Sequence, residues 1–395
     1  MPFVTIEDPA RRPAAGFALW QLGFRPFYLL ASMFAALSIP LWALQYAGWL
    51  PHPYLAGPAW HAHEMLFGFA LAVIVGFLFT AGRNWSGRPT PTGPALAALC
   101  LLWLAARVLV LTPYGWLAAA ASTAFPLCAA VGLAIPFVAA KNKRNYFFVG
   151  LLVMMGVASL LVHLVQLRVL DLPGWLGIQV ALDVVLFIMA VMGGRVIPMF
   201  TNNGVPGAGA RREPRLETFA LASVLAVLAA DVLQVNGPAL ALILLACGMA
   251  QLARLALWQP WKTRHTPIVW VLHAAYGWIG LHLLLRSGAA LGWLPSSVAA
   301  HALTVGAIGG MTLGMMTRTA RGHTGRPLKA DRFDVIAYLL ILAAAVVRVA
   351  AAWAVPALTV PAVLLSAVLW SAAFGLYAIR YWATLTRARV DGLAG

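Results

Sequence analysis

Histidines near the ends of apolar segments are the side chains of this chain best placed for metal chemistry. The 395-residue sequence contains nine histidines. Six fall inside stretches apolar enough to cross a membrane, where ionisable groups are costly and therefore functional candidates. The neutral imidazole is also the form of histidine that binds metal ions. The six are His61, His63, His163, His273, His282 and His301. In the topology predicted below, all except His273 lie in the outer half of the membrane, which predicts a metal or haem site there.

Helix geometry limits which of these histidines can share one ligand. At about 100° per residue, His61 and His63 point some 200° apart, so they do not easily bind one metal. They could serve two adjacent centres, or act as one ligand and one hydrogen-bonding partner. His273 and His282 also face roughly opposite ways. His273, with Tyr276 one turn further on, is the better member of the site, and His282 is interpreted as a packing residue.

Three charged residues inside the apolar segments could assist such a site. Glu64, directly after the His-x-His pair, and Asp183, near mid-membrane, could relay protons or orient a ligand histidine. The alternative for each is an ion pair or hydrogen bond between helices. Arg195 could pair with a haem propionate or a quinone head group. Its alternative role is to extend its guanidinium to lipid phosphate.

The elements that must position these residues are membrane-spanning helices. Hydrophobic residues make up 62% of the chain and charged residues only 10%, whereas soluble domains carry about 25% charged residues. A spanning helix needs about 20 apolar residues, and the chain divides into twelve such segments at proline- and glycine-rich breaks. The predicted helices are 24–47, 59–80, 93–111, 115–139, 146–168, 175–199, 216–235, 238–258, 266–286, 296–317, 332–354 and 357–382.

The distribution of lysine and arginine fixes the predicted orientation. Basic residues occur in alternate connecting segments, from Arg11 and Arg12 at the start to Arg387 and Arg389 at the end, and the intervening loops are depleted of them. This alternation predicts that both termini lie in the cytoplasm. The predicted parts are a cytoplasmic segment 1–23, a single twelve-helix domain 24–384 and a cytoplasmic tail 385–395. The net charge of +16 therefore indicates membrane orientation, and we expect no nucleic-acid partner.

Two of the predicted helices carry similar markers at both ends. His61 precedes Gly87 of a Gly-Arg-Pro turn by 26 residues, and His301 precedes Gly325 of a second such turn by 24 residues. Both helices run in the same direction, so the pattern indicates an internal pseudo-repeat.

Five stretches of the sequence carry a resemblance to a known family. They are 23–28 (GFRPFY), 60–68 (WHAHEMLFG), 194–198 (GRVIP), 301–309 (HALTVGAIG) and 322–327 (GHTGRP). With them the chain resembles the NnrS family of haem- and copper-containing membrane proteins linked to nitric oxide. The resemblance implies a bacterial inner-membrane protein with noncovalent haem b and copper, associated with denitrification and protection from nitrosative stress. Metal-ligand status carries over first to His61, His63 and His301, and then to His273 and His163.

The leading hypothesis is a nitric oxide reductase-type oxidoreductase with a haem–metal site in the outer half of the membrane. Quinol would supply the electrons and Glu64 would deliver protons. Two other classes of function remain open. One is a non-catalytic nitric oxide sensor or binder, which would need only the haem. A transporter would use the histidines as a relay site, and twelve helices with a parallel pseudo-repeat suit transporters too.

Overall fold

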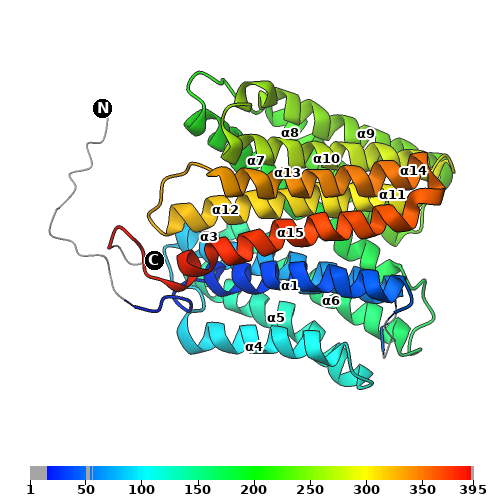
Figure 1. Ribbon diagram of the computed structural model, residues 1–395, viewed down its shortest axis with the longest axis horizontal. Coiled ribbons are helices and arrows are strands. Elements are labelled where there is room, and N and C mark those ends of the chain that lie inside the picture. The colour runs from blue at the N-terminus through cyan, green and yellow to red at the C-terminus, as the bar shows by residue number, and fades with distance from the viewer. Residues whose placement is uncertain (1–15, 50–53, 56, 393–395) are drawn as a thin grey trace.

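The computed structural model describes residues 16–49, 54–55 and 57–392 (Figure 1). Within these residues the chain is a bundle of long helices, and the β-structure is limited to an isolated bridge between Phe17 and Arg387. The predicted all-α polytopic bundle is confirmed. The basic segment predicted at Arg11 and Arg12 lies outside the described residues.

Every predicted span corresponds to a helix or to a continuous run of helices. In chain order they are α1 (Phe24–Tyr46), α2 (Gly57–His63), η1 (Glu64–Ala70), α3 (Leu71–Ser86), α4 (Gly93–Leu109), α5 (Gly115–Ala139), η2 (Lys143–Asn145), α6 (Tyr146–Gln166), α7 (Leu176–Gly204), α8 (Pro214–Val232), α9 (Gly237–Leu257), η3 (Pro260–Thr263), α10 (Pro267–Ala290), α11 (Ser296–His301), η4 (Ala302–Gly309), α12 (Gly310–His323), α13 (Arg332–Val346), η5 (Val347–Ala351), α14 (Ala352–Ala354), η6 (Pro356–Leu358) and α15 (Thr359–Thr386). The predicted ends differ from these by no more than six residues. The largest differences occur at the basic ends of α3 and α12, which continue through Arg83 and Arg321 because arginine is a good helix former although it ends an apolar pattern. Helix α7 also continues, through the largely polar residues 200–204.

Ten helical segments of the described chain are long and apolar enough to cross a membrane. The two other long helices differ from these in composition or length. Helix α4 has only 17 residues, and α8 carries Arg215, Glu217 and Asp231. The multi-pass architecture is therefore established, and the count of twelve spans and their orientation stay predictions.

The two described ends of the chain meet at one end of the bundle, which we call the basic end because its loops carry most of the loop lysines and arginines (left in Figure 1). The backbone amide of Ala18 donates to the carbonyl of Thr386 at 2.7 Å. Arg25, fully buried, donates from Nη1 to the carbonyls of Leu385 and Arg387 at 3.1 and 2.8 Å. Its guanidinium thus satisfies carbonyls at the end of α15, which otherwise have no partner within the helix.

Three segments of the bundle are π-helical: η1, η4 and η5. Segments η1 and η4 begin directly after His63 and His301, in the two helices that carry the predicted pseudo-repeat. Each of these two helices is therefore a short α-helix, then a π-helical segment, then a longer α-helix. Because π-turns insert extra residues into a helix, they alter which side chains face a neighbour, and they are frequent at functional sites.

Candidate metal and ligand site

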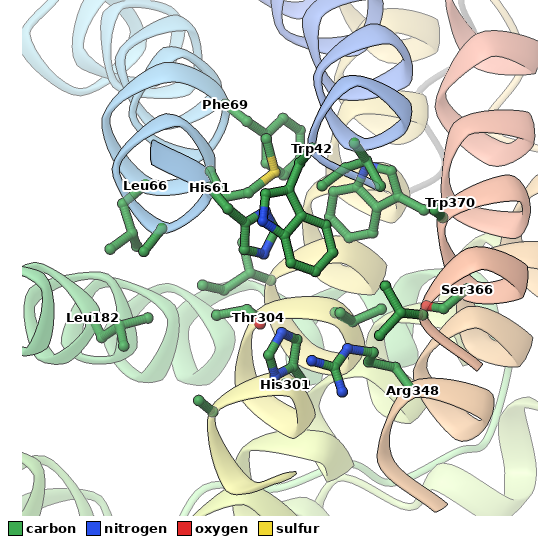
Figure 2. Close-up of a pocket in the computed structure, with 18 of the residues that line it drawn as sticks. Trp42, His61, Leu66, Phe69, Leu182, His301, Thr304, Arg348, Ser366 and Trp370 are labelled. Carbon is green, nitrogen blue, oxygen red and sulfur yellow. The ribbon is translucent and has the colours of Figure 1, made fainter. Parts of the chain in front are cut away.

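A cavity of about 150 Å³ lies between the helices toward the end of the bundle opposite the basic end. Figure 2 shows its walls, which come from α1, the α2–η1 segment, α7, the α11–η4 segment, η5 and α15. Residues of all three π-helical segments line it, including Met65 of η1, Thr304 of η4 and Arg348 of η5. Most of the remaining wall is aliphatic or aromatic, so a small uncharged molecule is well accommodated.

His61 and His301 face each other in this cavity. Their ring centres are 6.2 Å apart and their planes differ by 8°. The ring of His61 also stacks on Trp42, with centroids 4.2 Å apart. A metal bound by two imidazoles at about 2.0–2.1 Å per bond, with each nitrogen roughly 1 Å from its ring centre, holds the centres roughly 6 Å apart when the arrangement is nearly linear. The observed separation therefore fits one metal atom between the two rings.

The hydrogen bonds of the two rings leave nitrogen atoms available for a ligand. His301 Nδ1 donates to the carbonyl of Ser297 at 2.6 Å in the tautomer that leaves its Nε2 lone pair free. Metal-ligating histidines usually donate their second ring N–H to a carbonyl or carboxylate in this way. His61 Nδ1 is buried and has no hydrogen-bond partner. Buried polar atoms are nearly always satisfied, so such an orphan calls for a ligand or an ordered water.

Arg348 places a positive charge in the same cavity (Figure 2). Within the described residues its guanidinium has no hydrogen-bond or ion-pair partner, and it acts on both His61 and His301 as a nearby charge. An unpaired cation in an apolar cavity is costly, and a carboxylate of a ligand would offset that cost. Sequence reasoning missed Arg348, although it is an ionisable residue inside a predicted span and the same rule that selected the histidines applies to it.

His63 belongs to a second cluster, on the other side of its helix. Its Nδ1 lies 2.8 Å from Glu64 Oε1, which also accepts from Arg107 Nη1 at 2.5 Å. His63, Glu64 and Arg107 are all buried. The expectation that His61 and His63 point in opposite directions is confirmed, since their side chains join different clusters. Sequence reasoning missed Arg107, the buried cation that neutralises Glu64.

His163 completes the second cluster. Its ring centre lies 4.8 Å from that of His63 at an interplanar angle of 73°, and its Nδ1 lies 3.2 Å from the Tyr54 hydroxyl. Burial raises the pKa of Tyr54 to about 12, so the hydroxyl keeps its proton at neutral pH. The Nε2 atoms of His63 and His163 are both buried without a hydrogen-bond partner.

The separation of the two rings would suit a metal site with two nitrogen ligands. Ring centres 4.8 Å apart are closer than a linear arrangement allows and match a bent, near-tetrahedral nitrogen–metal–nitrogen angle. The Nδ1 contacts with Glu64 and Tyr54 would hold the two rings in place. No group of three or more histidine, cysteine, aspartate or glutamate side chains in the described residues is arranged to hold a metal ion. A metal at this position would therefore have two protein nitrogens and other ligands from outside the chain.

Asp183 lies on α7 next to the cavity wall and belongs to an ion-pair cluster. Its Oδ1 accepts from Gln179 at 3.0 Å and lies 3.6 Å from Arg286 Nη1. Arg286 also pairs with Asp231 at 2.5 Å. The preceding residue, Leu182, lines the cavity, but Asp183 does not. These contacts tie α7, α8 and α10 together.

The remaining predicted site residues lie elsewhere in the bundle. His273 Nε2 is 2.8 Å from the hydroxyl of Thr201, near the basic end of α7. Tyr276 bonds to Gln251 at 2.5 Å and accepts from Arg254 at 2.7 Å. Arg195 donates to Asn145 at 2.8 Å. The structure therefore brings together four of the predicted histidines and Glu64, but not these three residues, and their assignment to the cofactor stays a prediction.

Comparison with known proteins identifies the family. The model of the NnrS protein family matches residues 18–389, nearly the whole chain. The chain belongs to the NnrS family. No curated protein matches the chain. Family membership makes this a multi-pass membrane protein with a function related to nitric oxide, as the sequence motifs predicted.

The side chains that line the cavity could supply the ligands that a haem needs, but the cavity is small for the haem ring. Two opposed imidazoles are suited to haem iron, and Arg348 could pair with a propionate. The cavity of about 150 Å³ is below the roughly 300–1,000 Å³ usual for ligand sites. The donor set therefore fits, while the macrocycle requires that lining side chains such as Met65 move aside.

Proposed function

We propose that this NnrS protein binds haem b through His61 and His301, binds copper through His63 and His163, and reduces nitric oxide at this two-centre site, where the copper would hold nitric oxide and the haem would supply electrons. The observation that carries this proposal is the presence of two adjacent histidine pairs, in which His61, His63 and His163 each have a buried ring nitrogen without a hydrogen-bond partner. His61 and His63 are two residues apart on one helix and supply one ring to each pair. A π-helical segment follows immediately.

The proposed reaction joins two molecules of nitric oxide with two electrons and two protons, giving one nitrous oxide and one water. Haem and copper would supply the redox chemistry when bound. Nitric oxide is small and uncharged, so it can enter an apolar cavity from the bilayer. Holding two molecules close together would give the proximity effect that such a coupling needs. Quinol, a two-electron and two-proton carrier of bacterial membranes, is the proposed donor, and the inner membrane is the proposed location.

The chain's own residues have defined roles in this proposal. Arg348 would pair with a propionate of the bound haem, because it lines the same cavity as His301. Arg107 keeps Glu64 beside His63, and the Glu64 carboxylate in turn holds the His63 ring in place. Glu64 Oε2 is buried and unpartnered, so it is the carboxylate oxygen available to pass a proton.

The proposal is tested by measuring nitric oxide consumption by detergent-purified protein under anaerobic conditions with a reduced quinol. We expect steady consumption that depends on quinol and is lost in His61→Ala. Glu64→Gln should slow consumption and leave the haem absorption spectrum unchanged. His282→Ala is the matched control, because His282 also has a buried, unpartnered Nε2 but belongs to neither pair.

The other outcomes identify the competing functions. Haem that binds nitric oxide without quinol-dependent turnover would make the protein a sensor or binder. Folded protein without haem or copper would overturn the redox proposal and favour a transporter with a histidine relay.

A further inference from the structure

A groove of about 290 Å³ lies near the basic end, away from both histidine pairs. Its floor is α7, and its sides are α6 with the preceding turn η2, and the start of α8. Helix α7 packs against both α6 and α8. Along α7, the lining residues Phe187, Val191 and Arg195 follow one another at four-residue intervals, so they form one stripe on the helix. The groove therefore runs along the helices from an apolar part to a basic part.

The basic part brings three guanidinium groups together. Arg144 precedes α6, Arg212 precedes α8, and Arg195 projects from α7 between them. Arg144 and Arg212 act on Arg195 as like charges. Three neighbouring cations at the membrane surface repel one another, so an anion bound among them would be favourable.

The nearest carboxylate does not neutralise this group. Glu217 accepts from Arg254 through both oxygens, at 3.1 and 2.9 Å, and Arg254 is fully buried. Arg212 contacts the same carboxylate at 3.2 Å. One glutamate is thus shared between two arginines, which leaves Arg144 and Arg195 without an acidic partner among the described residues.

Arg195 is held in a fixed orientation. Its Nη1 donates to the buried side chain of Asn145 at 2.8 Å. Its guanidinium carbon lies 5.4 Å from the ring centre of Phe147, 5.5 Å from that of Phe148 and 5.8 Å from that of Trp85. An arginine fixed by stacking loses little side-chain entropy when it binds a phosphate.

We infer that this groove binds one anionic phospholipid, with its phosphate among Arg144, Arg195 and Arg212. An acyl chain would lie along the apolar stripe of Phe187 and Val191, with Leu221 on the facing side of α8. Basic pockets between transmembrane helices on the cytoplasmic side are suited to acidic head groups. The apolar continuation distinguishes a lipid from a free phosphate ion, and three cations favour an anionic lipid over a neutral quinol.

The test is native mass spectrometry of the full chain in mild detergent, with phosphatidylglycerol, phosphatidylcholine or inorganic phosphate added. We expect one retained phosphatidylglycerol per chain, no retained phosphatidylcholine, and no displacement by phosphate. Arg195→Gln and the double variant Arg144→Gln/Arg212→Gln should each weaken retention by about tenfold or more, since charge-assisted hydrogen bonds are lost. Arg215→Gln is the matched control, because it removes a charge at the same helix start but does not line the groove.

Arg144 and Arg212 are exposed, so their double variant keeps the test valid if Arg195→Gln fails to fold. Equal retention by wild type and the double variant would overturn the inference, as would equal retention of phosphatidylcholine. Displacement by inorganic phosphate would show a simple anion site and overturn the lipid assignment. None of these outcomes depends on haem, copper or nitric oxide.

Discussion

The pair formed by Arg107 and Glu64 allows a direct prediction of stability. Arg107 Nη1 lies 2.5 Å from Glu64 Oε1, and the two side chains are 7% and 1% exposed. Removing one partner of such a pair leaves a buried charge without compensation, which costs about 3–5 kcal/mol. We therefore expect Arg107→Met to lower the free energy of unfolding by about that amount. Glu64→Gln should have a similar effect, because it leaves the Arg107 charge buried.

The double variant tests the reasoning more sharply than either single variant. Arg107→Met/Glu64→Gln removes both charges, so it should cost clearly less than the sum of the single variants, with a coupling energy of up to about 3 kcal/mol. The measurement is unfolding of the purified protein by titration with a denaturing detergent. Arg88→Met, an exposed arginine, is the control and should change stability little. Additive costs, or single variants as stable as the wild type, would refute the argument.

The same cluster predicts an effect on metal binding. Glu64 contacts His63 Nδ1 at 2.8 Å, and outer contacts of this kind contribute about 10–100-fold to metal affinity. Glu64→Gln should therefore lower copper affinity by that factor, measured by competition with a chelator. Unchanged affinity would mean that His63 is not a ligand or that Glu64 does not orient it.

Three further predictions concern other parts of the bundle. Arg348→Gln should lower haem affinity while Arg348→Lys largely preserves it, as measured by haem transfer to an acceptor protein. Equal losses of affinity in the two variants would show that Arg348 acts through packing and not through its charge. Gly194→Ala should lower the free energy of unfolding by about 1–3 kcal/mol, because the added methyl would collide with Arg254. Gly150→Ala is the control: its added methyl meets no atom within 4 Å, so the variant should be neutral or stabilising. Asp331, the N-cap of α13, has a pKa below its usual range: burial raises it, but hydrogen bonds from the Asp334 amide and from Arg380 outweigh that effect. Its contribution to stability should be full above about pH 4 and be lost as pH falls through the lowered pKa, and an Asp331→Asn variant with the same acid dependence would contradict this.

The fold was predictable from the sequence because each link of the argument is local. Long apolar segments, proline- and glycine-rich breaks and alternating basic loops are all visible along the chain. The helix ends were predicted least well at the basic end, where α3 and α12 continue through residues such as Arg83 and Arg321. The three π-helical segments were not predicted, because a π-turn depends on packing between helices and leaves no clear pattern in the residues.

The site was predictable in part. The helical angle between His61 and His63 separated them correctly, and their depth placed them near His163 and His301. Partners from distant parts of the chain could not be found in this way. Arg107, for example, meets Glu64 only because α4 packs beside η1, and no local pattern records that contact. Depth alone also could not show that His273 faces Thr201 instead of the cavity.

The most direct test of the two-centre proposal is the haem and copper content of His301→Ala and His163→Ala, measured by pyridine haemochrome assay and elemental analysis. The proposal predicts that His301→Ala loses haem and keeps copper, while His163→Ala loses copper and keeps haem. Loss of both cofactors from each variant, or of neither, in folded protein would contradict it.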